Sequence, residues 1–202
     1  MVAVYPSTPA QYFHILRRHA RAKTRRPMVL MQPKSLLRMP EAASRLEDLS
    51  RGTFRSVIDD AASDAHRDAV RRLVFCTGKV YYDLVAARAA REKGGTSNGV
   101  AIARVEELYP WPHDGIAAIV DRYPNVEEVA WVQEEPKNMG AWSFVSPRLR
   151  ASTGNQLTVR YLGRPERASP AEGYHQAHMD EQARIVGEVL TLPQTSRRRA
   201  KV

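Results

Sequence analysis

Short apolar runs alternate with amphipathic stretches through most of the chain. From residue 72 onward, four runs are apolar at nearly every position, which is typical of strands buried on both faces of a sheet. The pattern predicts strands at residues 72–76, 100–103, 129–132 and 157–162, and helices at 81–91, 112–122, 142–149 and 173–190. Alternating strands and helices predict an α/β fold, with a mainly parallel sheet covered by helices on both faces.

The first 33 residues show a separate strand, helix and strand pattern. Residues 2–5 favour a strand, Thr8 is positioned to cap a helix, and Pro9 suits its first turn. The helix is predicted to be amphipathic, with an apolar side made of Tyr12, Phe13, Ile15, Leu16 and Ala20. A second apolar run at 28–31 predicts a buried strand that ends at Pro33. Residues 34–69 are less regular, and the composition of 61–68 is that of a polar surface loop.

The basic excess is confined to two short segments. The chain of 202 residues has 31 Lys and Arg against 22 Asp and Glu, a net charge of +9. Residues 17–26 hold six basic side chains and 197–201 hold four; without these ten, 21 basic residues face 22 acidic ones. The main body is therefore near neutral, and nucleic-acid binding is not indicated. Residues 193–202 are predicted to be a basic disordered tail.

Cysteine content and hydropathy exclude two further classes of protein. A single cysteine, Cys76, cannot form an internal disulfide, so a disulfide-stapled secreted scaffold is excluded and a cytoplasmic location is expected. Cys76 lies in an apolar run, which favours an inert buried thiol. The sequence has no long uncharged apolar segment that would predict a membrane helix, and its N-terminus lacks the pattern of a secretory signal.

Spacing alone identifies no reaction. Residues 75–79 run from a strand into Gly-Lys, but the first glycine and the hydroxyl residue of a phosphate loop are missing, so a tight turn is the better interpretation. His175 and His178 stand three residues apart without further ligands, which favours surface histidines over a metal site. Glu134 and Glu135 end a predicted strand, and a salt bridge is favoured over a catalytic pair. Ser7 has no His and Asp partners that spacing could justify.

Nine segments, however, resemble the C-terminal part of the thiamine-diphosphate-dependent, decarboxylating component of 2-oxoglutarate dehydrogenase. They occur in one order between residues 2 and 190, and one of them reads QEEPKNMGAW. The segments are 6–18, 26–27, 33–38, 77–84, 104–110, 133–142, 160–165, 168–171 and 173–174.

The resemblance implies a domain organisation. Residues 1–45 would be the incomplete end of a pyrimidine-binding-type domain, 46–69 a linker, and 70–192 a transketolase-type C-terminal α/β domain. In the full-length enzyme the family uses thiamine diphosphate and magnesium, held by a Gly-Asp-Gly segment and activated by a glutamate. This chain contains no Gly-Asp-Gly, so we expect it to bind neither cofactor alone, to contribute no catalytic residue, and to be inactive alone.

The leading hypothesis is a C-terminal piece of that component, supporting decarboxylation of 2-oxoglutarate and succinyl transfer to lipoyl groups through dimerisation and active-site shaping. Its partners would be the remaining domains of the component, a second copy in a homodimer, and the lipoyl succinyltransferase. The alternative is a free-standing domain that binds acyl-CoA or a nucleotide effector. The candidate phosphate-binding residues are Arg17, Arg18, Arg26, Lys34 and Arg38.

Overall fold

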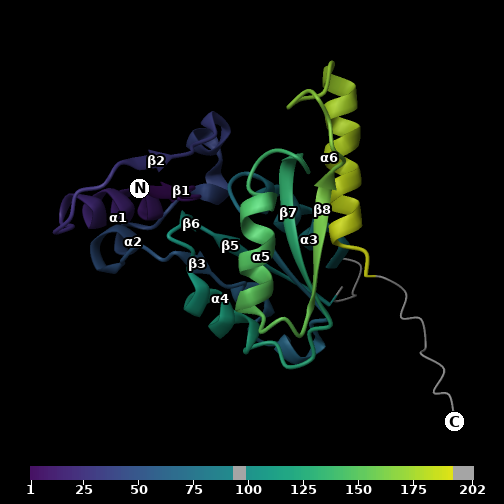
Figure 1. The fold of residues 1–202 in the computed structure, drawn as a ribbon, viewed down its shortest axis with the longest axis horizontal. Coiled ribbons are helices and arrows are strands. Elements are labelled where there is room, and N and C mark those ends of the chain that lie inside the picture. The colour runs from purple at the N-terminus through teal and green to yellow at the C-terminus, as the bar shows by residue number, and fades with distance from the viewer. Residues whose placement is uncertain (93–98, 193–202) are drawn as a thin grey trace, which may run out of the picture.

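Two sheets organise the chain in a computed structural model that describes residues 1–92 and 99–192 (Figure 1). The larger has five strands in the order β3-β5-β4-β7-β8, and the smaller has three in the order β2-β1-β6. The strands are β1 (Val2–Val4), β2 (Met28–Leu30), β3 (Val57–Ile58), β4 (Arg72–Cys76), β5 (Val100–Val105), β6 (Glu107–Tyr109), β7 (Glu128–Pro136) and β8 (Thr158–Arg164). The α-helices are α1 (Pro9–Ala20), α2 (Leu46–Arg51), α3 (Val80–Glu92), α4 (His113–Val120), α5 (Trp142–Ser152) and α6 (His175–Val189).

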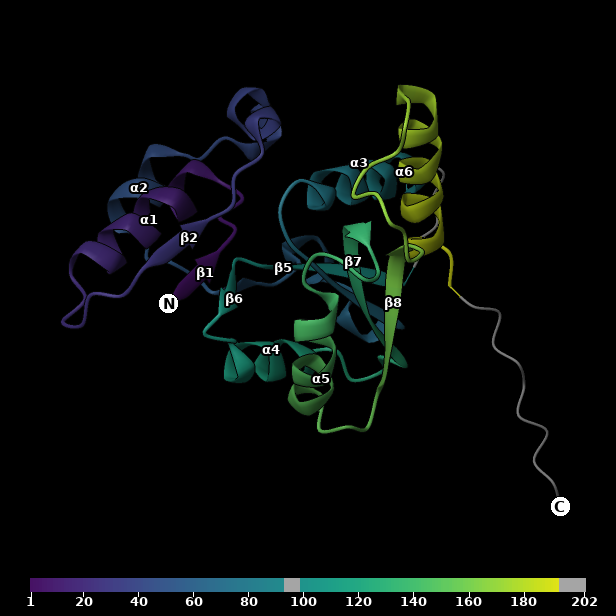
Figure 2. The ribbon, with the colours of Figure 1, turned by 45° about the horizontal axis from the view of Figure 1, so that its top comes forward.

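The larger sheet confirms the predicted α/β fold. Strand β4 pairs in parallel with β5 and β7, and β7 pairs in parallel with β8. Helices α3 and α6 cover one face, while α4 and α5 cover the other (Figure 2). All five residues of β4 are buried because the strand lies at the centre of both cores. The four strands and four helices predicted after residue 71 are all present, with ends shifted by a few residues.

Two strands escaped prediction because they are very short. Strand β3 adds an antiparallel edge beside β5, through the pairs Val57–Val105 and Ile58–Arg104. Strand β6 begins two residues after β5 ends, leaves the larger sheet, and pairs antiparallel with β1. The chain between β5 and β6 therefore links the two sheets directly.

The N-terminal strand and helix were predicted correctly, but their burial was not. Thr8 caps α1 by accepting a hydrogen bond from the Gln11 backbone, and Pro9 is its first residue. Of the predicted apolar side only Ile15 is buried: Tyr12, Phe13 and Leu16 are 41–44% exposed, and Ala20 is exposed too. The buried side consists of Ala10, Gln11, His14 and Ile15. The predicted strand at 28–31 forms as β2, but it lies at a sheet edge with Val29 49% exposed, so it is not buried.

The domain boundaries proposed at residues 45 and 69 stay a prediction. Between them the structure places α2, β3 and two single 3-10 turns, at Ala61–Ser63 and Arg67–Ala69. The basic tail predicted at 193–202 lies outside the described residues. Among the helices that are described, none has the length and apolar character needed to cross a membrane.

Candidate functional site

The link between the sheets carries two consecutive buried carboxylates, Glu106 and Glu107. Glu106 accepts hydrogen bonds from both the backbone N–H and the hydroxyl of Ser7, at 2.8 and 2.5 Å. The Ser7 hydroxyl in turn accepts one from Arg104 Nη1 at 2.8 Å. Tyr82 donates its hydroxyl to the Ser7 carbonyl at 2.7 Å. Ser7, which had no predicted role, therefore anchors the N-terminal segment to the larger sheet.

Burial dominates the electrostatics of Glu106. It raises the pKa of the Glu106 carboxyl, while Arg104 and the Ser7 donors oppose the rise. The Arg104 guanidinium lies over the Tyr81 ring, 4.3 Å from its centroid, so this cation has a fixed position beside the carboxylate. Ser7, Arg104 and Glu106 therefore form a hydrogen-bonded cluster in which the Glu106 carboxylate is buried.

Glu107 makes the second anchor and uses one of the predicted phosphate-binding residues. Its carboxylate forms an ion pair with Arg18 of α1, in which Arg18 Nη1 donates at 3.2 Å, and it accepts from the Ser56 hydroxyl at 2.7 Å. The Arg18 guanidinium also lies 4.4 Å from the centroid of the Phe54 ring. Arg18 is thus engaged in holding α1 against β6.

The structure brings Arg17 and Arg18 together at one basic groove at the C-terminal end of α1. This groove has a volume of about 500 Å³, and its lining also includes Arg21 and Phe54. Because Arg18 is paired with Glu107, the positive charge that the groove presents comes from Arg17 and Arg21. Arg17 and Arg21 are exposed there.

The other predicted residues lie elsewhere. Lys34 lines a second, mainly apolar groove of about 550 Å³ together with Tyr12, Leu36, Leu37 and Met39. Arg26 and Arg38 are exposed and line neither of these two grooves. The five predicted residues are therefore divided between two grooves and open surface.

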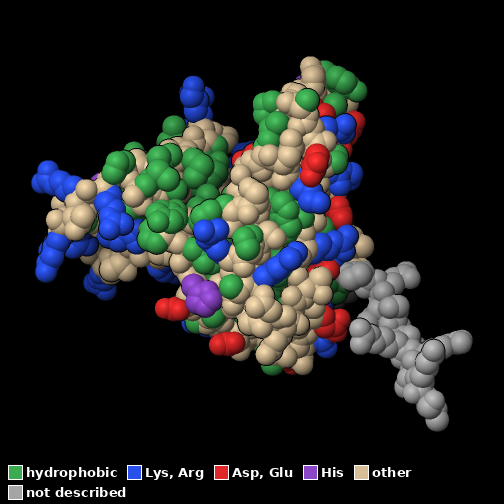
Figure 3. Space-filling model, in the orientation of Figure 1, with side chains coloured by type: hydrophobic (Ala, Val, Ile, Leu, Met, Phe, Trp, Pro, Cys, Tyr) green, Lys and Arg blue, Asp and Glu red, His purple; other side chains and the backbone are tan. Residues whose placement is uncertain are grey.

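Hydrophobic side chains gather on one face of the N-terminal region. Figure 3 shows them over the part of the molecule where Figure 1 places β1, β2 and α1, with Lys and Arg at its outer end. The exposed apolar residues of this N-terminal region are Met1, Tyr12, Phe13, Leu16, Val29 and Leu37. We call these six side chains the N-terminal apolar surface; two of them, Tyr12 and Leu37, line the second groove.

A separate polar cluster lies where β4 and β7 end. Lys79 Nζ lies 2.7 Å from Asp83 Oδ2 and 3.4 Å from Glu134 Oε1, which confirms the salt-bridge interpretation for Glu134. Burial, together with Glu134 and Glu135, raises the pKa of Tyr5 to about 12.

The Gly-Lys turn beside this cluster is a tight strand-to-helix connection, as predicted. Its glycine, Gly78, has a φ of 71°, in the left-handed region that favours glycine. The Tyr5 ring fills the space that a Cβ at residue 78 would need. Close approach of the N-terminal segment therefore adds a second reason for glycine at this turn.

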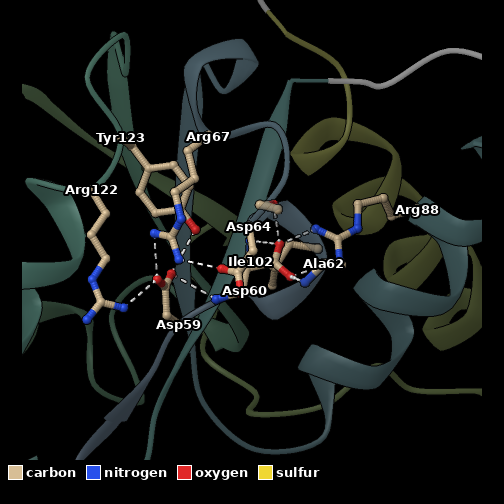
Figure 4. A network of polar contacts seen from close by, with 10 residues as sticks. Asp59, Asp60, Ala62, Asp64, Arg67, Arg88, Ile102, Arg122 and Tyr123 are labelled. Atoms are coloured by element: carbon tan, nitrogen blue, oxygen red, sulfur yellow. Dashed lines mark hydrogen bonds and ion pairs between the residues drawn. The ribbon is translucent and has the colours of Figure 1, made fainter.

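Sequence reasoning missed a network around Asp59 and Asp60 (Figure 4). Asp60 is 2% exposed and pairs with Arg88 of α3, while also accepting from the Ile102 backbone at 2.9 Å. Asp59 accepts from Tyr123 at 2.7 Å, from Arg67 at 2.9 Å and from Arg122 at 3.1 Å. Adjacent acids before a polar loop gave no periodic signal. Only the tertiary partners reveal their role, and most of them, namely Arg88, Ile102, Arg122 and Tyr123, come from distant parts of the chain.

The remaining candidate groups behave as structural residues. Cys76 is fully buried, and burial raises the pKa of its thiol. His178 contacts Arg164 with 3.0 Å between His Nδ1 and Arg Nη2, while His175 is exposed. Across residues 1–92 and 99–192 no group of three or more His, Cys, Asp or Glu side chains could hold a metal ion. A magnesium ion that holds a diphosphate is bound through grouped oxygen ligands, and the described residues offer no such group of acidic side chains.

Comparison with known proteins gives a consistent result over most of the chain. The family described as 2-oxoglutarate dehydrogenase C-terminal matches residues 43–190. The 2-oxoglutarate dehydrogenase E1 component of an Exiguobacterium species is 49% identical over 188 residues, covering 92% of this chain and 20% of that protein. Its counterpart from a Geobacillus species is 50% identical over 188 residues, covering 92% of this chain and 19% of that protein. The one from Cupriavidus necator is 44% identical over 199 residues, covering 95% of this chain and 20% of that protein. The chain spans about a fifth of the length of these relatives.

Proposed function

Because the chain belongs to the 2-oxoglutarate dehydrogenase C-terminal family, we propose that it serves as the C-terminal part of a 2-oxoglutarate dehydrogenase E1 component. In this role it supports oxidative decarboxylation of 2-oxoglutarate and succinyl transfer to lipoyl groups. The observation that carries the proposal is an identity of 44–50% over 92–95% of the chain.

The proposed contribution of the chain is structural. It forms a homodimer with a second copy, shapes the mouth of the active site, and meets the remaining domains of the component and the lipoyl succinyltransferase. The N-terminal apolar surface supports this structural role, because exposed apolar side chains that gather on one face are typical of interaction surfaces. We also propose that the protein is located in the cytoplasm.

Thiamine diphosphate, held through magnesium, supplies an electron sink for decarboxylation in the full-length enzyme. The described residues do not fit that cofactor, since no grouped set of metal-binding side chains occurs among them. We therefore assign no step of the cofactor's chemistry to them. Their proposed part is structural: they shape the mouth of the active site and form the homodimer.

A chimaeric enzyme tests the proposal. The matched C-terminal fifth of the Exiguobacterium E1 component is replaced by this chain, and 2-oxoglutarate-dependent decarboxylation is measured. We expect activity within about tenfold of the parent, which corresponds to a change of no more than about 1.4 kcal/mol in the activation free energy. A matched chimaera carrying Asp60→Ala, which breaks a buried ion pair, should lose activity. A soluble, folded chimaera without activity would contradict the proposal.

The basic groove supports a second candidate, a domain that binds acyl-CoA or a nucleotide effector. Arg17 and Arg21 are exposed beside Phe54, and their guanidinium groups suit phosphate. Calorimetry with acetyl-CoA and with AMP tests this candidate. Saturable heat that Arg17→Ala with Arg21→Ala abolishes would support it. Absence of heat with both ligands would remove it.

A further inference from the structure

A polar cavity of about 500 Å³ lies between the N-terminal half of α1 and the segment of residues 43–55, which contains α2. Figure 2 shows α1 and α2 side by side. The cavity is distinct from the two grooves described above, although its lining shares a few residues with each of them. Its volume lies in the range typical of small-molecule sites, about 300–1,000 Å³. Neither function proposed above depends on this cavity.

Hydrogen bonds between α1 and residues 43–55 hold the walls of the cavity in place. The Ser44 hydroxyl accepts a hydrogen bond at 3.0 Å from a backbone N–H in the first turn of α1. His14 Nε2 donates to the Asp48 carbonyl at 2.7 Å. The Gln11 side chain accepts from the Arg55 backbone N–H at 3.2 Å and donates to the Arg55 carbonyl at 2.7 Å. The cavity is therefore a fixed feature of the fold.

Three arginines line the cavity, and we call them the cavity arginines: Arg51, Arg55 and Arg104. One acid, Asp48, lines it too, but its Oδ2 accepts from the Arg45 backbone N–H at 3.0 Å, at the start of α2. In the described part of the chain, none of the cavity arginines forms an ion pair with a carboxylate; the ion pairs there use other arginines. The cavity is thus lined by more positive than negative charge.

Arg104 is the most informative of the three, because it is partly buried. The buried Arg88 pairs directly with a carboxylate, whereas Arg104 donates from Nη1 to the Ser7 hydroxyl and reaches Glu106 only through that group. Its guanidinium is held over the Tyr81 ring. A cation that is partly removed from water is stabilised by a nearby anion. Arg104 therefore has a fixed position and charge that a bound anion could neutralise.

Hydroxyl groups complete the lining. Those of Thr8 and Ser44 each accept a hydrogen bond from a backbone N–H of α1, so their own hydrogens stay free to donate. Thr53 adds an exposed hydroxyl. Anionic oxygens accept hydrogen bonds from guanidinium and hydroxyl groups alike. We propose that the cavity binds a small oxyanion with two or more negative charges, carried by phosphate groups or by several carboxylates, between the three cavity arginines.

Three anions test the site by calorimetry on the complete 202-residue chain at constant ionic strength. Pyrophosphate represents phosphate groups, citrate represents several carboxylates, and acetate carries a single charge. We expect saturable binding of pyrophosphate or citrate at millimolar concentration or below, and binding at least ~10-fold weaker for acetate, which can engage only one guanidinium. The tighter of the two multivalent anions identifies the source of the charge. Absence of saturable heat with both, or equally tight binding of acetate, would overturn the proposal.

Two double variants distinguish the cavity from the neighbouring basic groove. Arg51→Gln with Arg55→Gln removes two cavity arginines, whereas Arg17→Gln with Arg21→Gln removes two arginines of the basic groove. All four side chains are exposed, so both variants should fold, and circular dichroism checks this. We expect the Kd of the tighter anion to rise at least ~10-fold in the first variant and to stay within about twofold in the second. Unchanged affinity in the first variant, or a loss confined to the second, would refute the assignment.

Chemical modification of the unaltered chain tests all three cavity arginines, including Arg104. Phenylglyoxal reacts with arginine side chains, and mass spectrometry measures the rate at each residue. At about ten times the Kd of the tighter anion, about one tenth of the sites stay free, so modification of the cavity arginines should slow about tenfold. Arg17 and Arg21 should keep their rates. Equal rates at the cavity arginines with and without the anion would contradict the proposal.

Discussion

The larger sheet and the N-terminal region use apolar residues in different ways. In the sheet, strands β4 and β7 are buried on both faces between two helical layers. In the N-terminal region, α1 buries one side only and leaves Tyr12, Phe13 and Leu16 exposed. Both regions show an apolar pattern that predicts burial. The difference teaches that an apolar pattern predicts a helix or a strand more reliably than it predicts burial within the chain.

The largest effect is expected inside the sheet region, at the buried ion pair between Asp60 and Arg88. Asp60→Ala removes the partner of a buried guanidinium and also the acceptor for the Ile102 backbone. Breaking a buried pair in this way destabilises a protein by about 3–5 kcal/mol. Urea unfolding followed by circular dichroism measures the loss.

The matched control for Asp60→Ala is Asp64→Ala. Asp64 is exposed and pairs with Arg67 at the surface, where an ion pair contributes about 0–1 kcal/mol. If the two variants lose similar stability, the buried network does not hold the sheet as described.

The next effect concerns the junction between the two regions. Ser7→Ala leaves Arg104 and Glu106 each short of a partner, at a cost of about 1–3 kcal/mol. We expect the N-terminal region to loosen first, so protease cleavage within residues 1–55 should accelerate more than cleavage in the sheet. Ser35→Ala, at an exposed position, is the control. Uniform acceleration along the chain would mean that the two regions unfold as one unit.

A smaller effect is expected from pH at the edge of the sheet. Burial opposes ionisation of Asp59, but hydrogen bonds from Tyr123, the Asp60 backbone, Arg67 and Arg122 outweigh it and lower the pKa of its carboxyl below the ordinary value. A lowered pKa contributes stability that is fully present above about pH 4 and is lost as the pH falls through the folded value. The stability advantage over Asp59→Asn, measured by urea unfolding at a series of pH values, should therefore shrink below about pH 4. An advantage independent of pH would contradict this.

The smallest effect on stability is expected at the N-terminal apolar surface. Leu16→Lys with Leu37→Lys changes two exposed side chains, so unfolding free energy should move by no more than about 0.5 kcal/mol. Self-association of the purified chain should nevertheless fall, because the apolar patch is interrupted. Light scattering after size-exclusion chromatography measures this. A parent chain that is already a monodisperse monomer would contradict the assignment of this surface to an interface.

The strands of the larger sheet could be predicted because most of them are continuous apolar runs separated by stretches with helical spacing. Strands β3 and β6 could not be predicted, because two or three residues are too few to show a hydrophobic periodicity and their pairing depends on distant segments. The same holds for the polar sites. The basic residues near α1 were visible as a run, but the partners of Arg18 lie at Glu107 and Phe54, far along the chain.

The central claim is that the N-terminal apolar surface is covered when the chain forms part of an E1 component. A single thiol at this surface tests it: residue 16 in Leu16→Cys is exposed, whereas the native Cys76 is fully buried. Maleimide labelling of residue 16, read by mass spectrometry, is compared between the isolated chain and the chimaeric enzyme. The account predicts rapid labelling of the isolated chain and strong protection in the chimaera. Equally rapid labelling in both would contradict it.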